Sequence, residues 1–142
     1  MTNSVKQQAV SSKQGTSQTI TKFTDLRAWQ EGHLLVISIY KLTQDFPAQE
    51  QFGLTSQIRR SAVSITSNIA EGFSRPTTKD KLRFYSMALG SLTELQNQML
   101  IARDVGYVSS KDLQIFAKNS VVVHKIINGL KKSLNSGKGV KK

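Results

Sequence analysis

The chain has 142 residues, a length that suits one domain with a single hydrophobic core. It contains no cysteine, which excludes disulfides, thiolate zinc sites and a cysteine nucleophile, and which favours a reducing, cytoplasmic setting. The longest mainly apolar stretch, Leu34 to Leu42, is much shorter than the ~20 residues that a membrane span requires. We therefore expect a soluble protein with no membrane partner.

The formal net charge of +11 is concentrated near the two ends of the chain. Residues 1–24 contain three lysines and residues 125–142 contain six, and neither segment has an acidic residue. The intervening residues carry eleven basic and nine acidic side chains. Lysine-rich ends can attract polyanions by releasing counterions, or they can simply keep a protein in solution. Both interpretations remain open.

Residues 1–22 are polar, have no hydrophobic period and are predicted to form a disordered basic tail. The folded domain is expected over residues 23–135. Its first helix should start after a side-chain cap at Thr24 or Asp25, since apolar residues then recur at helical spacing. Phe46-Pro47 should end this helix, because proline disfavours the α conformation of the residue before it.

Two further helices follow in the middle of the chain. The second is predicted to start at Gly53-Leu54-Thr55 and to close at Gly72 and Arg75-Pro76. The third should start near Thr77 or Thr78 and end at Asp104-Val105-Gly106, with Gly106 as its C-terminal cap. Gly90 lies inside this third helix and is expected to let another helix approach closely.

The fourth helix is predicted from an N-cap at Ser109, with Asp112 three residues later as a variant of the capping box, to Asn135. Residues 136–142 are expected to be a second disordered basic tail. Four helices joined by short connections predict antiparallel neighbours. The fold class is therefore all-α, an up-and-down antiparallel four-helix bundle.

The apolar faces of these helices are wider than one small bundle core requires. Leu34, Met87, Val121 and Val122 are among the extra apolar residues. An exposed apolar surface usually marks an interface, so self-association is the expected use. The alternative is a thicker core that buries these residues within one chain.

Catalytic and metal-binding patterns are absent from the sequence. His33 and His124 lack a carboxylate or a second histidine three or four residues away on the same helix, and we expect both to be partly buried and hydrogen-bonded. No phosphate-binding glycine loop or nucleophile motif occurs. Glu71 would be the single available general base, and Ser64 has no histidine to activate it. We expect no catalytic residues, metal, cofactor or small-molecule substrate.

One face of the second helix is polar, and its role has two interpretations. A structural network, in which Arg59 or Arg60 pairs with Glu71, would comprise Gln57, Arg60, Ser64, Asn68 and Glu71. Alternatively, the basic residues of this region and of the last helix bind phosphates. The candidate nucleic-acid contacts are Arg59, Arg60, Arg75, Lys79, Lys81, Arg83, Lys131 and Lys132.

Several motifs resemble one known family. They are DLRAWQ at residues 25–30, FGLTSQIRRSAVSI at 52–65, SNIAEGFSR at 67–75 and GSLTEL at 90–95. These motifs resemble the four-helix-bundle proteins encoded in intervening sequences of bacterial 23S ribosomal RNA genes. The resemblance covers about residues 24–134, and Thr66 stands where the motif usually has proline.

The resemblance implies assembly into a ring, commonly a homopentamer. It also implies a relation to the accessory variability proteins of diversity-generating retroelements, which look like basic partners of a reverse transcriptase and its template RNA. We therefore expect a non-catalytic, oligomeric bundle that binds RNA, or DNA, through its basic tails and the Arg/Lys cluster. The alternative is an adaptor for a protein partner such as a reverse transcriptase.

Overall fold

The computed structural model describes residues 19–137, so most of both predicted tails lies outside the described residues. Within this range the chain forms four long helices and two single-turn 3-10 helices, and no strand. The elements are η1 (Phe23–Asp25), α2 (Arg27–Thr43), η2 (Ala48–Glu50), α3 (Leu54–Ser74), α4 (Thr78–Asp104) and α5 (Ser110–Asn135). The all-helical, four-helix fold predicted from the sequence is confirmed.

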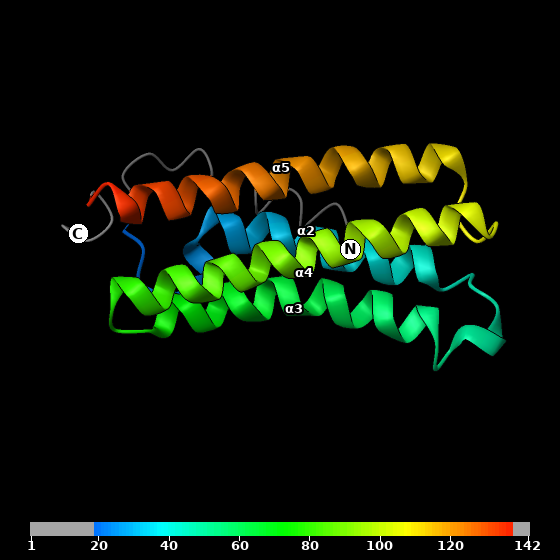
Figure 1. Cartoon of the computed structure of the whole chain (residues 1–142), viewed down its shortest axis with the longest axis horizontal. Coiled ribbons are helices and arrows are strands. Elements are labelled where there is room, and N and C mark those ends of the chain that lie inside the picture. Colours follow the sequence, from blue (N-terminus) through cyan, green and yellow to red (C-terminus); the bar gives the residue numbers. More distant parts are fainter. Residues whose placement is uncertain (1–18, 138–142) are drawn as a thin grey trace.

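The four long helices lie side by side, and each runs antiparallel to the one before it (Figure 1). α3 packs against α4 most extensively, α2 packs against α3, and α5 contacts both α4 and α2. The helices therefore surround one core. None of the described helices is long and apolar enough to cross a membrane.

The core is built from the apolar stripe that each helix turns inward. Its fully buried members include Ile39 of α2, Ile58 and Ile65 of α3, Leu92 and Leu95 of α4, and Ile127 of α5. In α3 the buried residues Ile58, Ala62, Ile65 and Ile69 recur at the three- and four-residue spacing that places side chains on one face of a helix. Packing of these stripes holds α3 in helical form although its β-branched residues have modest helix propensity.

The later helix ends follow the sequence signals. Ser109 Oγ accepts a hydrogen bond from the backbone N–H of Asp112 at 3.0 Å, and Thr77 caps α4 in the same way. Gly106 adopts a left-handed φ of 91° after the end of α4. Its N–H donates to the carbonyl of Arg103, and the N–H of Tyr107 donates to that of Ala102, the two bonds of a Schellman motif.

The predicted cap of the first helix is wrong. α2 begins after Leu26, which has no capping side chain, and Thr24 and Asp25 lie in η1 instead. The Asp25 carboxylate accepts hydrogen bonds from the backbone N–H groups of Thr21 and Lys22, so it stabilises the turn that precedes the helix. Thr21 and Lys22, which were assigned to the tail, thus belong to the structured part of the chain.

The first helix also ends earlier than predicted. α2 stops at Thr43, and the backbone N–H of Phe46 donates to the Thr43 carbonyl in a separate turn. Phe46 is buried against the core, and Pro47 serves as the N-cap of η2. The chain therefore turns inward at Phe46 before the proline.

Glu50 anchors the connection between η2 and α3. Its carboxylate accepts hydrogen bonds from the backbone N–H of Leu54 at 3.1 Å and from the hydroxyl of Tyr107 at 2.9 Å. The bond to Glu50 raises the pKa of the Tyr107 hydroxyl. One side chain thus supports the start of α3 and joins it to the loop after α4.

Each of the two alternatives for the wide apolar faces, an exposed interface and a thicker core, holds for some of their residues. Met87, Val121 and Val122 remain exposed, as an interface would require. Other apolar residues of these helices, including Leu35 and Ile39, are buried in a core thicker than one narrow stripe. Gly90 was expected to admit a neighbouring helix, but no described atom other than those of its own stretch of α4 lies within 4 Å of the position of a Cβ.

Candidate functional site

A short chain of hydrogen bonds joins α3 to α4 on the polar side of the helix pair. Ser64 Oγ and Ser91 Oγ share a hydrogen bond of 2.8 Å. Asn68 Nδ2 donates to the carbonyl oxygen of Ser64 at 2.9 Å and to its hydroxyl at 3.1 Å. Ser64 and Asn68 therefore belong to one polar contact, but their partner is Ser91, which the sequence interpretation did not include.

The expected pairing of Arg59 or Arg60 with Glu71 is wrong. Glu71 forms an ion pair with Arg75, one helical turn further along, at 2.6 Å. Arg59 points to α2, where its Nε donates to Thr43 Oγ1 at 2.8 Å and its guanidinium lies 4.6 Å from the centre of the Tyr40 ring. Arg59 lies three turns from Glu71 on α3, and nearer partners satisfy both groups.

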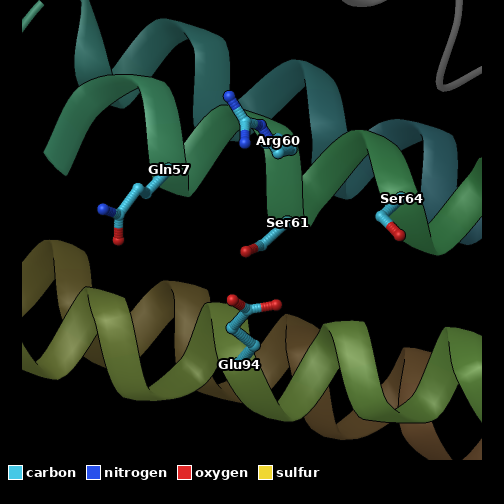
Figure 2. Close-up of a pocket in the computed structure, with 5 residues that line it drawn as sticks. All are labelled: Gln57, Arg60, Ser61, Ser64 and Glu94. Atoms are coloured by element: carbon cyan, nitrogen blue, oxygen red, sulfur yellow. The ribbon is translucent and has the colours of Figure 1, made fainter. Parts of the chain in front are cut away.

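Gln57 and Arg60 line a polar pocket between α3 and α4 of about 280 Å³ (Figure 2). Ser61, Ser64 and Glu94 complete its lining. Ser61 and Glu94 point toward each other across the gap, whereas Arg60 points away from Glu94 (Figure 2). Among the described residues neither Arg60 nor Glu94 has an ion-pair partner.

Glu94 is the charged member of this pocket that sequence reasoning missed. Its carboxylate lies 3.5 Å from Nε2 of Gln98, whose buried Oε1 has no hydrogen-bond partner among the described residues. The Ser64–Ser91 contact and the position of Glu94 opposite Ser61 belong to the same antiparallel packing of α3 against α4. Helix periodicity alone does not give the register between helices.

Besides Arg59, three more of the candidate phosphate-binding residues are engaged with the protein itself. Arg75 pairs with Glu71 and lies 4.6 Å from the centre of the Phe84 ring. Arg83 lies at the same distance from this ring and is 3.7 Å from Asp80. The third residue is Lys81.

Lys81 caps the C-terminal end of α3. Its ammonium donates to the carbonyl of Phe73 at 2.6 Å and lies 3.5 Å from that of Gly72. Carbonyls at a helix C-terminus lack intrahelical partners and carry partial negative charge, so a cation is favourable there. Burial lowers the pKa of the Lys81 ammonium. Lys81 is therefore a structural residue in this fold.

Lys79, Lys131 and Lys132 differ from these three residues. Lys79 and Lys132 are exposed and Lys131 is partly exposed. None of the three has an ion pair or a hydrogen bond from its side chain to another described residue. These lysines therefore remain available to an anionic partner.

The structure separates the predicted basic cluster into two groups. Arg59 and Arg60 lie in the first third of α3, and Arg75 follows its last residue, about 24 Å further along at 1.5 Å per residue. The start of α4 and the end of α5, which carry the remaining candidates, lie at the same end of the bundle as Arg75 (Figure 1). The eight residues do not form one patch.

Charge is distributed unequally along the bundle. The end formed by residues 19–31, 70–84 and 124–137, here called the basic end, contains nine basic and four acidic residues. The rest of the described chain contains six basic and five acidic residues. The described chain both begins and ends at the basic end (Figure 1). Residues 1–18 and 138–142, which continue from there, add five lysines and no acid.

The two histidines have ordinary neighbours. The ring of His33 stacks on that of Trp29 with 4.6 Å between centroids, and His124 Nδ1 lies 3.3 Å from Asn128 Nδ2. Both histidines are partly buried, as predicted, but among the described residues the predicted hydrogen bond is found for His124 and not for His33. Within residues 19–137 no three His, Cys, Asp or Glu side chains are grouped so that they could hold a metal ion.

The family model of the 23S rRNA-intervening sequence proteins matches residues 24–129. The chain belongs to this family. The match spans most of the described helices, and the resemblance noted from the α3 motifs is thus confirmed. No curated protein sequence matches the chain.

A solved structure supports the fold independently. It is the crystal structure of a protein of unknown function from the S23 ribosomal protein family of Bacteroides thetaiotaomicron. It superposes with a TM-score of 0.69, at 19% identity, over 74% of this chain and 95% of that chain. At this level of identity the similarity concerns the fold.

Proposed function

We propose that this protein is a non-catalytic, oligomeric member of its family that binds RNA through the basic end of the bundle and the adjoining tails. The observation that carries the proposal is the unequal charge along the bundle. Nine of the fifteen basic residues in the described chain lie at the end where that chain both begins and ends. In the sequence, residues 1–18 and 138–142 adjoin the first and last residues of this end and add five lysines and no acidic residue.

The available lysines favour contacts to phosphates rather than to base edges. An ammonium on a flexible stem acts as a point charge, and its binding to a phosphate releases condensed counterions. Lys79, Lys131 and Lys132 can make such contacts without breaking any ion pair of the fold. The proposed binding is therefore electrostatic and sensitive to salt.

Assembly would strengthen this binding. Val121 and Val122 on α5 and Met87 on α4 are between 39% and 47% exposed, and apolar surface of this kind fits contact with another copy. We propose a homopentameric ring, in which five basic ends share one nucleic acid and weak contacts add through avidity. The mass of the full chain in solution tests the number of copies: a mass other than five chains would contradict the pentamer.

The experiment for RNA binding compares two triple variants over a range of salt concentrations. Lys79→Gln/Lys131→Gln/Lys132→Gln removes available charges at the basic end. Its control, Arg60→Gln/Lys111→Gln/Lys118→Gln, removes three exposed charges elsewhere on the bundle. Each phosphate contact to a single strand contributes about 0.7 to the slope of log affinity against log salt.

We expect the first triple variant to reduce the slope by about 2 and the control to leave it nearly unchanged. Equal effects of the two variants would show that binding follows total charge rather than the basic end. A wild-type affinity that does not change with salt would exclude phosphate contacts altogether.

A second function, an adaptor for a protein such as a reverse transcriptase, is favoured by the opposite end of the bundle. Phe52, before α3, is 91% exposed, and Leu100, Ile101 and Val105 at the end of α4 are 43% to 55% exposed. A partner recovered equally before and after nuclease treatment, and lost with Phe52→Ser/Ile101→Ser, would support this function. Loss of every partner on nuclease treatment would contradict it.

A further inference from the structure

Three aromatic rings stand in a row where η1 meets α2. The rings of Phe23 and Trp29 meet edge to face with their centroids 5.6 Å apart. Trp29 then stacks on His33, with centroids 4.6 Å apart and planes only 14° from parallel. η1 packs against both α2 and α3, so the row lies where these helices meet the chain's first described residues.

A fourth ring continues the row along α2. Tyr40 follows His33 by seven residues, two turns of helix and about 10.5 Å along the axis, and therefore points to nearly the same side. The guanidinium of Arg59 lies over the Tyr40 ring at 4.6 Å, and the bond from its Nε to Thr43 holds it there. The row therefore ends in a fixed planar cation. Phe23, Trp29, His33, Tyr40 and Arg59 are called the aromatic row below.

The rings remain accessible to a partner. Phe23 is 37% exposed and Tyr40 is 39% exposed, while Trp29 and His33 are partly exposed. This accessibility is unusual, because aromatic side chains of a small bundle normally fill its core. Trp29 also packs against the hydrophobic core with part of its surface, whereas Phe23 and Tyr40 do not belong to that core.

The electrostatic setting of the aromatic row is positive. Residues 22–43 contain three basic residues, Lys22, Arg27 and Lys41, against two acidic residues, Asp25 and Glu31, and residues 54–70 of α3 contain two basic residues and no acidic one. Lys22 directly precedes Phe23, and Arg59 lies at the other end of the row. A second copy docked face to face would bring these cations close to their counterparts, whereas a polyanion would be attracted.

Exposed rings combined with cations are the chemistry that binds unpaired bases. Single-stranded nucleic acids stack their bases on aromatic rings and on guanidinium planes while lysine and arginine neutralise the phosphates. Bases inside a duplex are stacked on each other and cannot enter such a row. From this combination we propose that the aromatic row stacks unpaired bases of a single-stranded nucleic acid. The proposal rests on the proposed function and adds to it a preference for single strands.

Trp29 makes the proposal directly measurable, because it is the only tryptophan in the chain. Its fluorescence reports the environment of the aromatic row with no added label. The full-length protein is titrated at low salt with oligouridylate, whose bases are unpaired, and separately with a mixed-sequence RNA duplex of equal length. We expect oligouridylate to quench Trp29 and to bind at least about tenfold more tightly than the duplex, as stacking of one base typically contributes.

Three variants locate the effect. Tyr40→Leu removes an exposed ring and should weaken oligouridylate binding about tenfold, and Tyr40→Phe, which retains the ring, should bind like the wild type. Phe52→Leu is the matched control, because Phe52 is an exposed ring that lies before α3 and outside the aromatic row. Helix content measured by circular dichroism confirms that each variant remains folded.

The outcomes separate this inference from the function on which it rests. Salt-sensitive binding that does not quench Trp29 and is unaffected by Tyr40→Leu would support the basic end and overturn the aromatic row. Equal affinity for oligouridylate and duplex would also overturn it. Absence of binding to either RNA would overturn both proposals. If the Trp29 signal instead follows protein concentration without RNA, a second copy covers the row and the inference is wrong.

Discussion

Gly72 of α3 lies so close to Tyr85 of α4 that a side chain would not fit between them. A Cβ at Gly72 would be 2.7 Å from Cε1 of Tyr85 and 3.0 Å from the Cβ of Phe84. Tyr85 is 2% exposed, and its burial raises the pKa of its hydroxyl to about 12. The ring is enclosed and has no room to move aside. Glycine at this position thus permits the close approach of α3 and α4 near their shared turn.

Gly72→Ala should therefore lower the free energy of unfolding by about 1–3 kcal/mol, the usual cost of forcing extra volume into a packed interior. Gly90→Ala is the matched control, since nothing lies within 4 Å of its Cβ position and α4 is regular there. This second change should raise the free energy of unfolding by about 0.5–1 kcal/mol, because alanine loses less backbone entropy than glycine.

Urea unfolding followed by circular dichroism measures both changes. Destabilisation by Gly90→Ala together with loss of the oligomer would mean that another copy packs against Gly90, which the single chain does not show. Stabilisation by Gly72→Ala would contradict the close contact with Tyr85.

The sequence predicted the helices more accurately than the contacts between them, and the helix ends show why. The caps at Ser109 and Gly106 depend on residues within one turn, so local chemistry suffices to find them. Asp25 has equally good capping chemistry, but its carboxylate bonds to the N–H groups of Thr21 and Lys22 on its N-terminal side. The local sequence pattern does not show whether the Asp25 carboxylate accepts hydrogen bonds from N–H groups that precede it or from N–H groups that follow it.

The candidate site depended on contacts between helices, which periodicity does not supply. Arg59 or Arg60 was expected to pair with Glu71, but Glu71 lies about three turns further along the same helix, and Arg59 instead meets Thr43 on α2, a contact that depends on how the two helices pack. The sequence also does not distinguish a lysine that caps a helix from a lysine that has no partner among the described residues. Lys79 and Lys81 are two residues apart, yet one is exposed and the other lies over the end of α3.

Glu71 provides a test of the revised polar contacts. Because its carboxylate and Arg75 form an ion pair within one turn, with side chains 48% and 37% exposed, Glu71→Gln should change the free energy of unfolding by at most ~0.5 kcal/mol. Thermal or urea unfolding measures the difference. A loss of 2 kcal/mol or more, about what breaking a buried network costs, would restore the network interpretation.

The carboxyl group of Asp25 should make the free energy of unfolding depend on pH. Hydrogen bonds from the backbone N–H groups of Thr21 and Lys22 lower the pKa of its carboxyl below the ordinary value of 3.8. Since the folded pKa is below the unfolded one, Asp25 contributes stability above pH 3.8 and loses that contribution as the pH falls through the folded pKa.

Asp25→Asn removes this titration while retaining the shape of the side chain. We expect wild type to be more stable than the variant at neutral pH, and the difference to shrink as the pH falls below 3.8. Urea unfolding monitored by Trp29 fluorescence at a series of pH values measures the difference. A difference that stays constant or grows in acid would contradict the assigned role of Asp25.

The last prediction separates a lysine that holds the fold from a lysine that is free to bind. Lys81→Gln removes the hydrogen bond of 2.6 Å to the Phe73 carbonyl and should cost about 1 kcal/mol of stability, with little effect on RNA affinity. Lys79→Gln should change stability by less than ~0.5 kcal/mol and reduce RNA affinity at low salt, because its ammonium has no partner among residues 19–137. Urea unfolding and an RNA titration on the same two variants measure both effects. The reverse pattern would mean that RNA displaces Lys81 from the end of α3, and the basic end would then have to change its internal contacts on binding.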